Sequence, residues 1–115
     1  MAIPTGTVTI SVLYPRDETS TFDMSYYLST HIPMAERAWS PHGMLTWSVV
    51  EIPDPKAKFN VHCLISWTAK GETGMDGVMA GRTSEAGKEL VADVPNFSNR
   101  KPEVIIGSVK ASGKV

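Results

Sequence analysis

The chain has 115 residues, 42% hydrophobic and 20% charged, so we expect a single globular domain over residues 1–115. Its net charge of −1, without any basic run, argues against non-specific binding to nucleic-acid phosphates. The single cysteine, Cys63, excludes an internal disulfide, and neither a signal-peptide pattern nor a membrane-spanning apolar run is present, so we expect a cytoplasmic protein.

The first predicted elements are a strand and a long helix. Residues 7–14 alternate as a strand does, with an apolar row of Val8, Ile10, Val12 and Tyr14. Residues 22–39 predict an amphipathic helix whose inward face carries Met24, Tyr27, Leu28, His31, Ala35, Ala38 and Trp39. Pro33 lacks an N–H, so this helix should kink or restart just after His31, with Ile32 pushed away from helical angles.

Two more strands follow. The second strand, residues 44–52, has an apolar row of Leu45, Trp47 and Val49. The third strand, residues 60–68, has an apolar row of Val61, Cys63, Ile65 and Trp67. Because Leu64 interrupts the polar row of the third strand, we expect both of its faces to be covered.

The last predicted elements are a glycine-rich helical segment and a strand. Residues 70–91 fit a helical stripe, but their five glycines favour two short helices, broken near Gly81 and recapped by Thr83 or Ser84. Whether the segment forms one helix or two stays open. Residues 103–110 read as the final strand.

The order strand, helix, strand, strand, helix, strand predicts an α+β, ferredoxin-like βαββαβ fold with a four-stranded antiparallel sheet covered by helices on one face. The alternate rows of the strands are Thr, Ser, His and Leu rather than Lys and Glu. We therefore expect the uncovered face to meet the sheet of a second copy, which predicts a homodimer.

His31 is the first candidate for chemistry, because it is a titratable group on the inward helix face beside a predicted break. It could act as a general acid or base, or simply donate a hydrogen bond within the core. Tyr27 shares its face one turn earlier and could hydrogen-bond a substrate oxygen, whereas Tyr26 is rotated away and expected to be partly exposed.

Further side chains could bind a flat apolar ligand, with ordinary core packing as the alternative for each. His62 could lie in the same pocket or in a dimer interface, since the sequence does not say which sheet face is which. The predicted substrate-binding residues are Tyr14, Trp39, Trp47, His62 and Phe97.

The stretch YYLSTHIPMAERAW, residues 26–39, resembles the first-helix signature of the EthD family, and DVPNF, residues 93–97, resembles the loop before its last strand. The resemblance implies a dimeric α+β barrel with a hydrophobic pocket between sheet and helices in each subunit. It also implies that His31 is the pocket histidine, with Tyr27 and Pro33 beside it and residues 93–97 near the pocket. The superfamily includes cofactor-independent enzymes and members without a known reaction.

Three functions fit these features. The first is a cofactor-independent enzyme, a cyclase, isomerase, dehydratase or oxygenase, in which His31 and Tyr27 are catalytic and a small flat oxygenated molecule is the substrate. The second is a non-catalytic binding protein for a hydrophobic or aromatic ligand, or an EthD-like accessory protein in ether degradation. The third is a structural dimer without a ligand.

Other classes of site lack support in the sequence. The three histidines and one cysteine form no metal-ligand spacing, so we expect no metal. There is no dinucleotide or phosphate-loop motif, and we expect no cofactor and no nucleic acid or membrane partner.

Overall fold

A computed structural model describes residues 3–68 and 74–115. The strands are β1 (Val8–Pro15), β2 (Met44–Glu51), β3 (Phe59–Trp67) and β4 (Glu103–Ser108). The α-helices are α1 (Met24–Tyr26), α2 (Ile32–Trp39), α3 (Gly74–Thr83) and α4 (Glu85–Asp93). A π-helical turn, Tyr27–His31, joins α1 to α2, and short 3₁₀ turns cover Ser40–His42 and Val94–Asn96.

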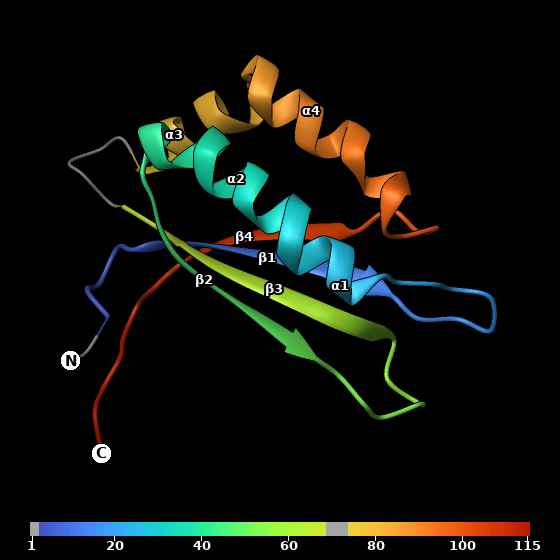
Figure 1. The fold of residues 1–115 in the computed structure, drawn as a ribbon. Coiled ribbons are helices and arrows are strands. Elements are labelled where there is room, and N and C mark those ends of the chain that lie inside the picture. The colour runs from blue at the N-terminus through green and yellow to red at the C-terminus, as the bar shows by residue number, and fades with distance from the viewer. Residues whose placement is uncertain (1–2, 69–73) are drawn as a thin grey trace.

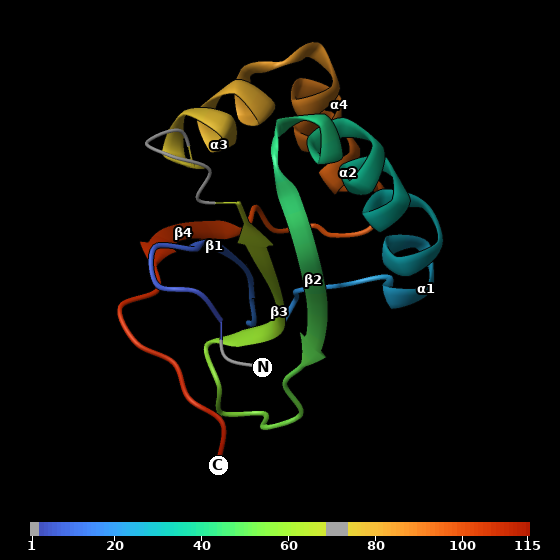
Figure 2. The same cartoon turned by 90° about the vertical axis from the view of Figure 1, so that its left-hand side faces the viewer.

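The four strands form one antiparallel sheet in the order β2-β3-β1-β4. All the described helices lie on one face of this sheet, with α2 and α4 side by side, and no helix of residues 3–68 or 74–115 covers the opposite face (Figure 1, Figure 2). The predicted ferredoxin-like α+β fold is confirmed.

The core lies between the sheet and the helices. The apolar rows of β1 and β3 both point into it, because pairs such as Ile10 with Ile65 and Val12 with Cys63 share one face in the antiparallel register. Trp67 is fully buried at the end of this row, and its Nε1–H donates to the His42 carbonyl at 2.7 Å. Truncating a side chain of this size in a core costs about 3–5 kcal/mol.

Strand β2 differs from the predicted register. A bulge between Met44 and Thr46 leaves Leu45 exposed, and the helix-facing row is Met44, Trp47 and Val49. The predicted row of Leu45, Trp47 and Val49 is therefore wrong at its first position. A bulge adds one residue to a strand, which moves the preceding side chains to the opposite face.

The π-helical turn replaces the predicted kink at Pro33. The N–H of Ile32 donates to the carbonyl of Tyr27, five residues earlier, and Ile32 keeps helical angles of φ −61 and ψ −45. The wider turn relieves the clash between the proline ring and the preceding carbonyl, so the helix continues through Pro33. The turn also rotates Leu28 outward, and its side chain is 44% exposed rather than inward-facing.

The glycine-rich segment forms two helices, and residues 70–73 of the predicted span lie outside the described residues. The break falls at Ser84, whose side chain accepts from the Gly87 N–H at 3.0 Å as the N-cap of α4. A Cβ on Gly87 would lie 2.1 Å from the Gly81 carbonyl oxygen, and a Cβ on Gly81 would lie 3.0 Å from the Trp39 ring. The glycines thus allow close packing that offsets their low helix propensity.

The helix-free face of the sheet is apolar at several positions. Leu64 from β3, Val50 from β2 and Ile105 from β4 are all exposed, and Ile105 retains 55% of its accessible surface. These residues belong to the alternate rows, opposite the core. His62 lies in the same row as Leu64.

Candidate functional site

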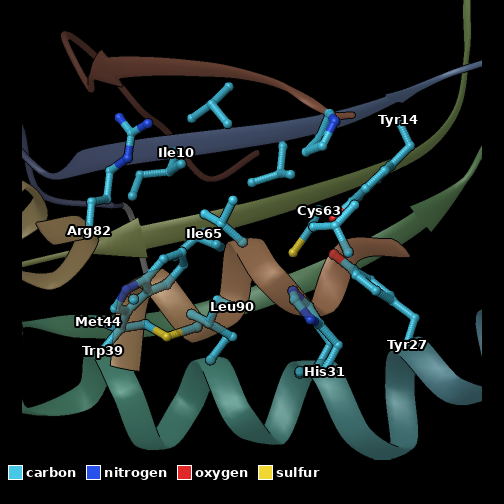
Figure 3. A pocket seen from close by; sticks show the side chains of 18 of the residues that line it. Ile10, Tyr14, Tyr27, His31, Trp39, Met44, Cys63, Ile65, Arg82 and Leu90 are labelled. Carbon is cyan, nitrogen blue, oxygen red and sulfur yellow. The ribbon is translucent and has the colours of Figure 1, made fainter. Parts of the chain in front are cut away.

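A cavity of about 340 Å³ lies between the helices and the sheet. Side chains from β1, β3, α2, α3 and α4 line it, and most of them are apolar (Figure 3). At one end His31 and Tyr27 rise from the helix toward Cys63 and Tyr14 on the sheet, and Arg82 lies toward the other end. An apolar cavity with a few convergent polar groups is typical of a small-molecule site.

His31 closes the wall of this cavity and is held by one carboxylate. The residue is 8% exposed, and its Nδ1 lies 2.9 Å from Oδ2 of Asp93, the last residue of α4. Its Nε2 has no hydrogen-bond partner in the described part of the chain, and the ring lines the cavity. The arrangement leaves one ring nitrogen tied to an acid and the other available to a ligand.

Asp93 is itself held by two further donors. The hydroxyl of Tyr26 donates to its Oδ1 at 2.6 Å, and the side-chain amide of Asn96 donates to the same oxygen at 2.9 Å. Tyr26 precedes the π-helical turn and Asn96 follows α4, so the carboxylate links the first helical segment to the end of α4. A buried carboxylate with three donors has a fixed position and favours its charged form.

The electrostatics keep this pair as a neutral imidazole and an ionised carboxylate. Burial lowers the pKa of His31 below its ordinary value, although the neighbouring Asp93 partly opposes that shift. Burial acts to raise the pKa of Asp93, but hydrogen bonds from Tyr26, Asn96 and His31 outweigh it and hold the pKa below its ordinary value. The shared hydrogen therefore resides on Nδ1, and Nε2 carries a lone pair toward the cavity.

Tyr27 and Tyr14 provide hydroxyl groups at the same end of the cavity. Burial is the main cause that raises the pKa of each phenol, so both stay protonated at neutral pH and remain donors. The ring of Tyr27 stacks on His31 with 5.4 Å between centroids and 15° between planes. Burial also raises the pKa of the Cys63 thiol, which makes it a poor nucleophile.

The predicted site residues fall into two groups. The cavity brings together Tyr14, Tyr27, His31 and Trp39. Phe97 lies behind the site, with its ring centroid 4.5 Å from that of His31, and contributes to the core.

Two predicted substrate-binding residues lie away from the cavity. Trp47 is partly exposed on the edge strand β2, where its Nε1–H donates to Glu36 at 3.0 Å. His62 belongs to the alternate row of β3 and points to the helix-free face. Neither residue can reach a ligand in the cavity, because one side chain covers the flank of α2 and the other lies across the sheet.

The sequence does not single out Arg82, and the resemblance places Asp93 and Asn96 only in a loop near the pocket. Asp93 lies 62 positions from His31, so no local spacing connects them. Tyr26 was expected only to be partly exposed, as it is, but its hydroxyl reaches Asp93. The DVPNF motif was the available signal for the acid, since it contains both Asp93 and Asn96.

The folded protein is expected to lose stability as the pH falls. The pKa of His31 is lowered from 6.5 in the folded protein, so as the pH falls below 6.5 the unfolded chain binds a proton before the folded protein does. The stability that the neutral His31 contributes is therefore fully present above pH 6.5 and is lost as the pH falls below it. Urea unfolding from about pH 8 to about pH 5 should show this slope. A His31→Gln variant should have a shallower slope, whereas the turn variant His42→Gln should keep it; equal slopes in native protein and His31→Gln would contradict the assignment.

Other kinds of site find no support in residues 3–68 and 74–115. They contain no group of three or more His, Cys, Asp or Glu side chains arranged to hold a metal ion. None of the described helices has the length and apolar character that crossing a bilayer requires.

The fold and cavity define a ferredoxin-like α+β protein with a largely apolar pocket between its sheet and its helices. Its sequence matches no family model and has no significant match among curated proteins. Solved structures do match. An EthD-like protein from Ralstonia eutropha JMP134 aligns with a TM-score of 0.70 at 20% identity, over 94% of this chain and 96% of that chain.

Two further structures share the fold. An ethyl tert-butyl ether degradation (EthD) family protein from Bacillus halodurans C-125 aligns with a TM-score of 0.62 at 21% identity, over 88% of this chain and 96% of that one. SnoaB, a cofactor-independent oxygenase from Streptomyces nogalater, aligns with a TM-score of 0.61 at 12% identity, over 92% of this chain and 95% of that chain. The chain thus has the fold of EthD-like proteins, in agreement with the resemblance of its motifs.

Proposed function

We propose that this protein is an EthD-like enzyme that moves a proton on a small, flat, oxygenated organic molecule without a cofactor. The observation that carries the proposal is the hydrogen-bonded pair of His31 and Asp93 in the wall of an apolar cavity. A neutral imidazole oriented by a carboxylate is a general base, and burial of the pair beside a ligand-sized space gives it a substrate to act on.

The chemistry follows from the free nitrogen of His31. Its Nε2 takes a proton from a carbon next to a carbonyl group, which leaves an imidazolium and an enolate. Asp93 stabilises the imidazolium, and the hydroxyl of Tyr27 donates to the enolate oxygen. Return of the proton to a different atom completes an isomerisation, and loss of a hydroxide or attack on a second carbonyl gives a dehydration or cyclisation.

The cavity walls supply the binding energy for such a substrate. Trp39, with aliphatic side chains from β1, β3 and α4, offers a flat apolar surface to a ring. The shared fold with a cofactor-independent oxygenase supports chemistry of this general class at this site. A protein that only carries the ligand would bind it without moving a proton.

Hydrogen–deuterium exchange tests the proposal without knowledge of the natural substrate. We expect the protein to accelerate exchange of the acidic methylene protons of 2-tetralone, a flat ketone, in deuterated buffer, as followed by NMR. His31→Ala should abolish the acceleration, whereas His42→Ala, in a surface turn, should retain it. Undiminished exchange by His31→Ala would remove the histidine from the mechanism, and binding of 2-tetralone with no exchange would identify a carrier.

We also propose that the protein is a homodimer in which the helix-free faces of two sheets meet. The exposed apolar side chains of Val50, Leu64 and Ile105 support this arrangement, because a soluble protein seldom leaves such a surface uncovered. His62 would then lie in the interface rather than in the cavity, which is the alternative that its strand position left open.

A further inference from the structure

The cavity has a closed end around His31 and a mouth that opens to solvent. His31, Tyr27 and Cys63 at the closed end are buried. At the mouth, Met79 of α3, Val91 of α4 and Val104 of β4 line the cavity and are all exposed, with Val91 at 72%. The opening of the cavity therefore lies between the two C-terminal helices and the edge strand β4.

Arg82 is the charged group at this mouth. It lies in the last turn of α3, is exposed, and lines the cavity. Its guanidinium forms neither a hydrogen bond nor an ion pair within the described residues, and the described lining of the cavity contains no Asp or Glu. A position in the last turn suits the helix dipole, but that interaction leaves the N–H donors of the guanidinium free.

Arg82 and His31 lie at opposite ends of the cavity. The residue before Arg82, Gly81, packs against Trp39 at the C-terminal end of α2, while His31 precedes the N-terminal end of that helix. Eight residues of helix separate Trp39 from His31, or roughly 12 Å along the axis. In Figure 3, Arg82, Trp39 and Met44 lie toward one side of the cavity, and His31 and Tyr27 lie toward the other.

We propose that the ligand is an organic acid with a flat apolar skeleton, whose carboxylate binds Arg82 while its opposite end meets His31. A guanidinium with free donors binds a carboxylate through two parallel hydrogen bonds, and no acid in the described lining competes for it. The separation of the two groups suits a bicyclic or tricyclic skeleton. This inference rests on the proposed function for the role of His31, but the recognition of the anion stands on Arg82 alone.

Binding of two matched probes tests the recognition of the anion. Calorimetry with 2-naphthoate and with its neutral amide, naphthalene-2-carboxamide, compares ligands that share one ring system and differ in charge. The native protein should bind the carboxylate about 10- to 100-fold more tightly than the amide, as expected for hydrogen bonds to a charged group. In Arg82→Gln this preference should disappear, with the affinity for the amide unchanged, and Arg82→Lys should restore part of it.

A matched variant controls for general charge effects. Arg37→Gln removes the same charge from an exposed position of α2 outside the cavity lining, and should keep the preference for the carboxylate. Equal affinity of the native protein for the two probes, or no binding of either, would overturn the inference, as would a preference that survives Arg82→Gln. The binding measurement needs no turnover, so it can be repeated in a His31→Ala background. If the Arg82-dependent preference for the carboxylate persists there, recognition of the anion stands even if the proposed proton transfer fails.

Discussion

Replacement of Asp93 by asparagine is expected to lower the rate of proton transfer by about 10²- to 10⁴-fold, the range seen when the acid partner of a catalytic histidine loses its charge. The variant keeps the shape of the side chain but removes the negative charge that stabilises the imidazolium of His31. It also replaces one carboxylate oxygen by an amide NH2, so the group that faces Nδ1 no longer has to be an acceptor and no longer fixes the hydrogen there. Deuterium exchange of 2-tetralone gives the rate.

A second measurement separates this positioning role from a structural one. Because Asp93 acts to raise the pKa of His31 against the effect of burial, the Asp93→Asn variant should show a lower His31 pKa by NMR titration. Glu89→Gln removes a carboxylate from the exposed side of the same helix and should change neither the rate nor the titration. An unchanged His31 pKa in Asp93→Asn would show that the carboxylate does not tune the imidazole.

The variant Ile105→Glu is expected to convert the proposed dimer into a monomer. Ile105 projects from β4 on the helix-free face and is 55% exposed in the single chain, so it would become buried when two sheets meet. A carboxylate there would be desolvated twice in a symmetric interface, once from each copy. Light scattering coupled to size exclusion, at micromolar concentration, gives the mass directly.

The control for the dimer places the same charge on the other side of the molecule. Leu28→Glu alters an exposed leucine of the π-helical turn, far from the helix-free face, and should leave the dimer intact. A native protein that is monomeric at this concentration would contradict the barrel arrangement. A dimer that survives Ile105→Glu but not Leu28→Glu would move the interface to the helices.

Much of the fold follows from local pattern. The alternation in β1 and β3 predicts which side chains face the core, and the order of the elements predicts the sheet topology. The deviations have local causes that a periodic pattern does not contain. One inserted residue in β2 exposes Leu45, and the five-residue hydrogen-bond step at Tyr27 lets the helix pass through Pro33.

The site was predictable only where one element contained it. His31 and Tyr27 share a helix, so their spacing reveals a common face. Asp93 reaches His31 only after α4 docks on α2, a contact between residues 62 positions apart. Trp47 points to the same face of the sheet as the lining residues, but it lies on an edge strand beyond the cavity. His62 points to the opposite face of the sheet.

The two faces of the sheet imply how paired subunits would sense each other's ligands. Along β3, Cys63 lines the cavity, while its neighbours His62 and Leu64 point to the helix-free face. A ligand that pushes on Cys63 therefore displaces backbone whose adjacent side chains would touch the partner. In such a dimer only the thickness of one sheet separates the cavity from the partner subunit, and neither a hinge nor a series of helices lies between them. Any cooperativity between subunits would therefore depend on the rigidity of the two central strands, β1 and β3.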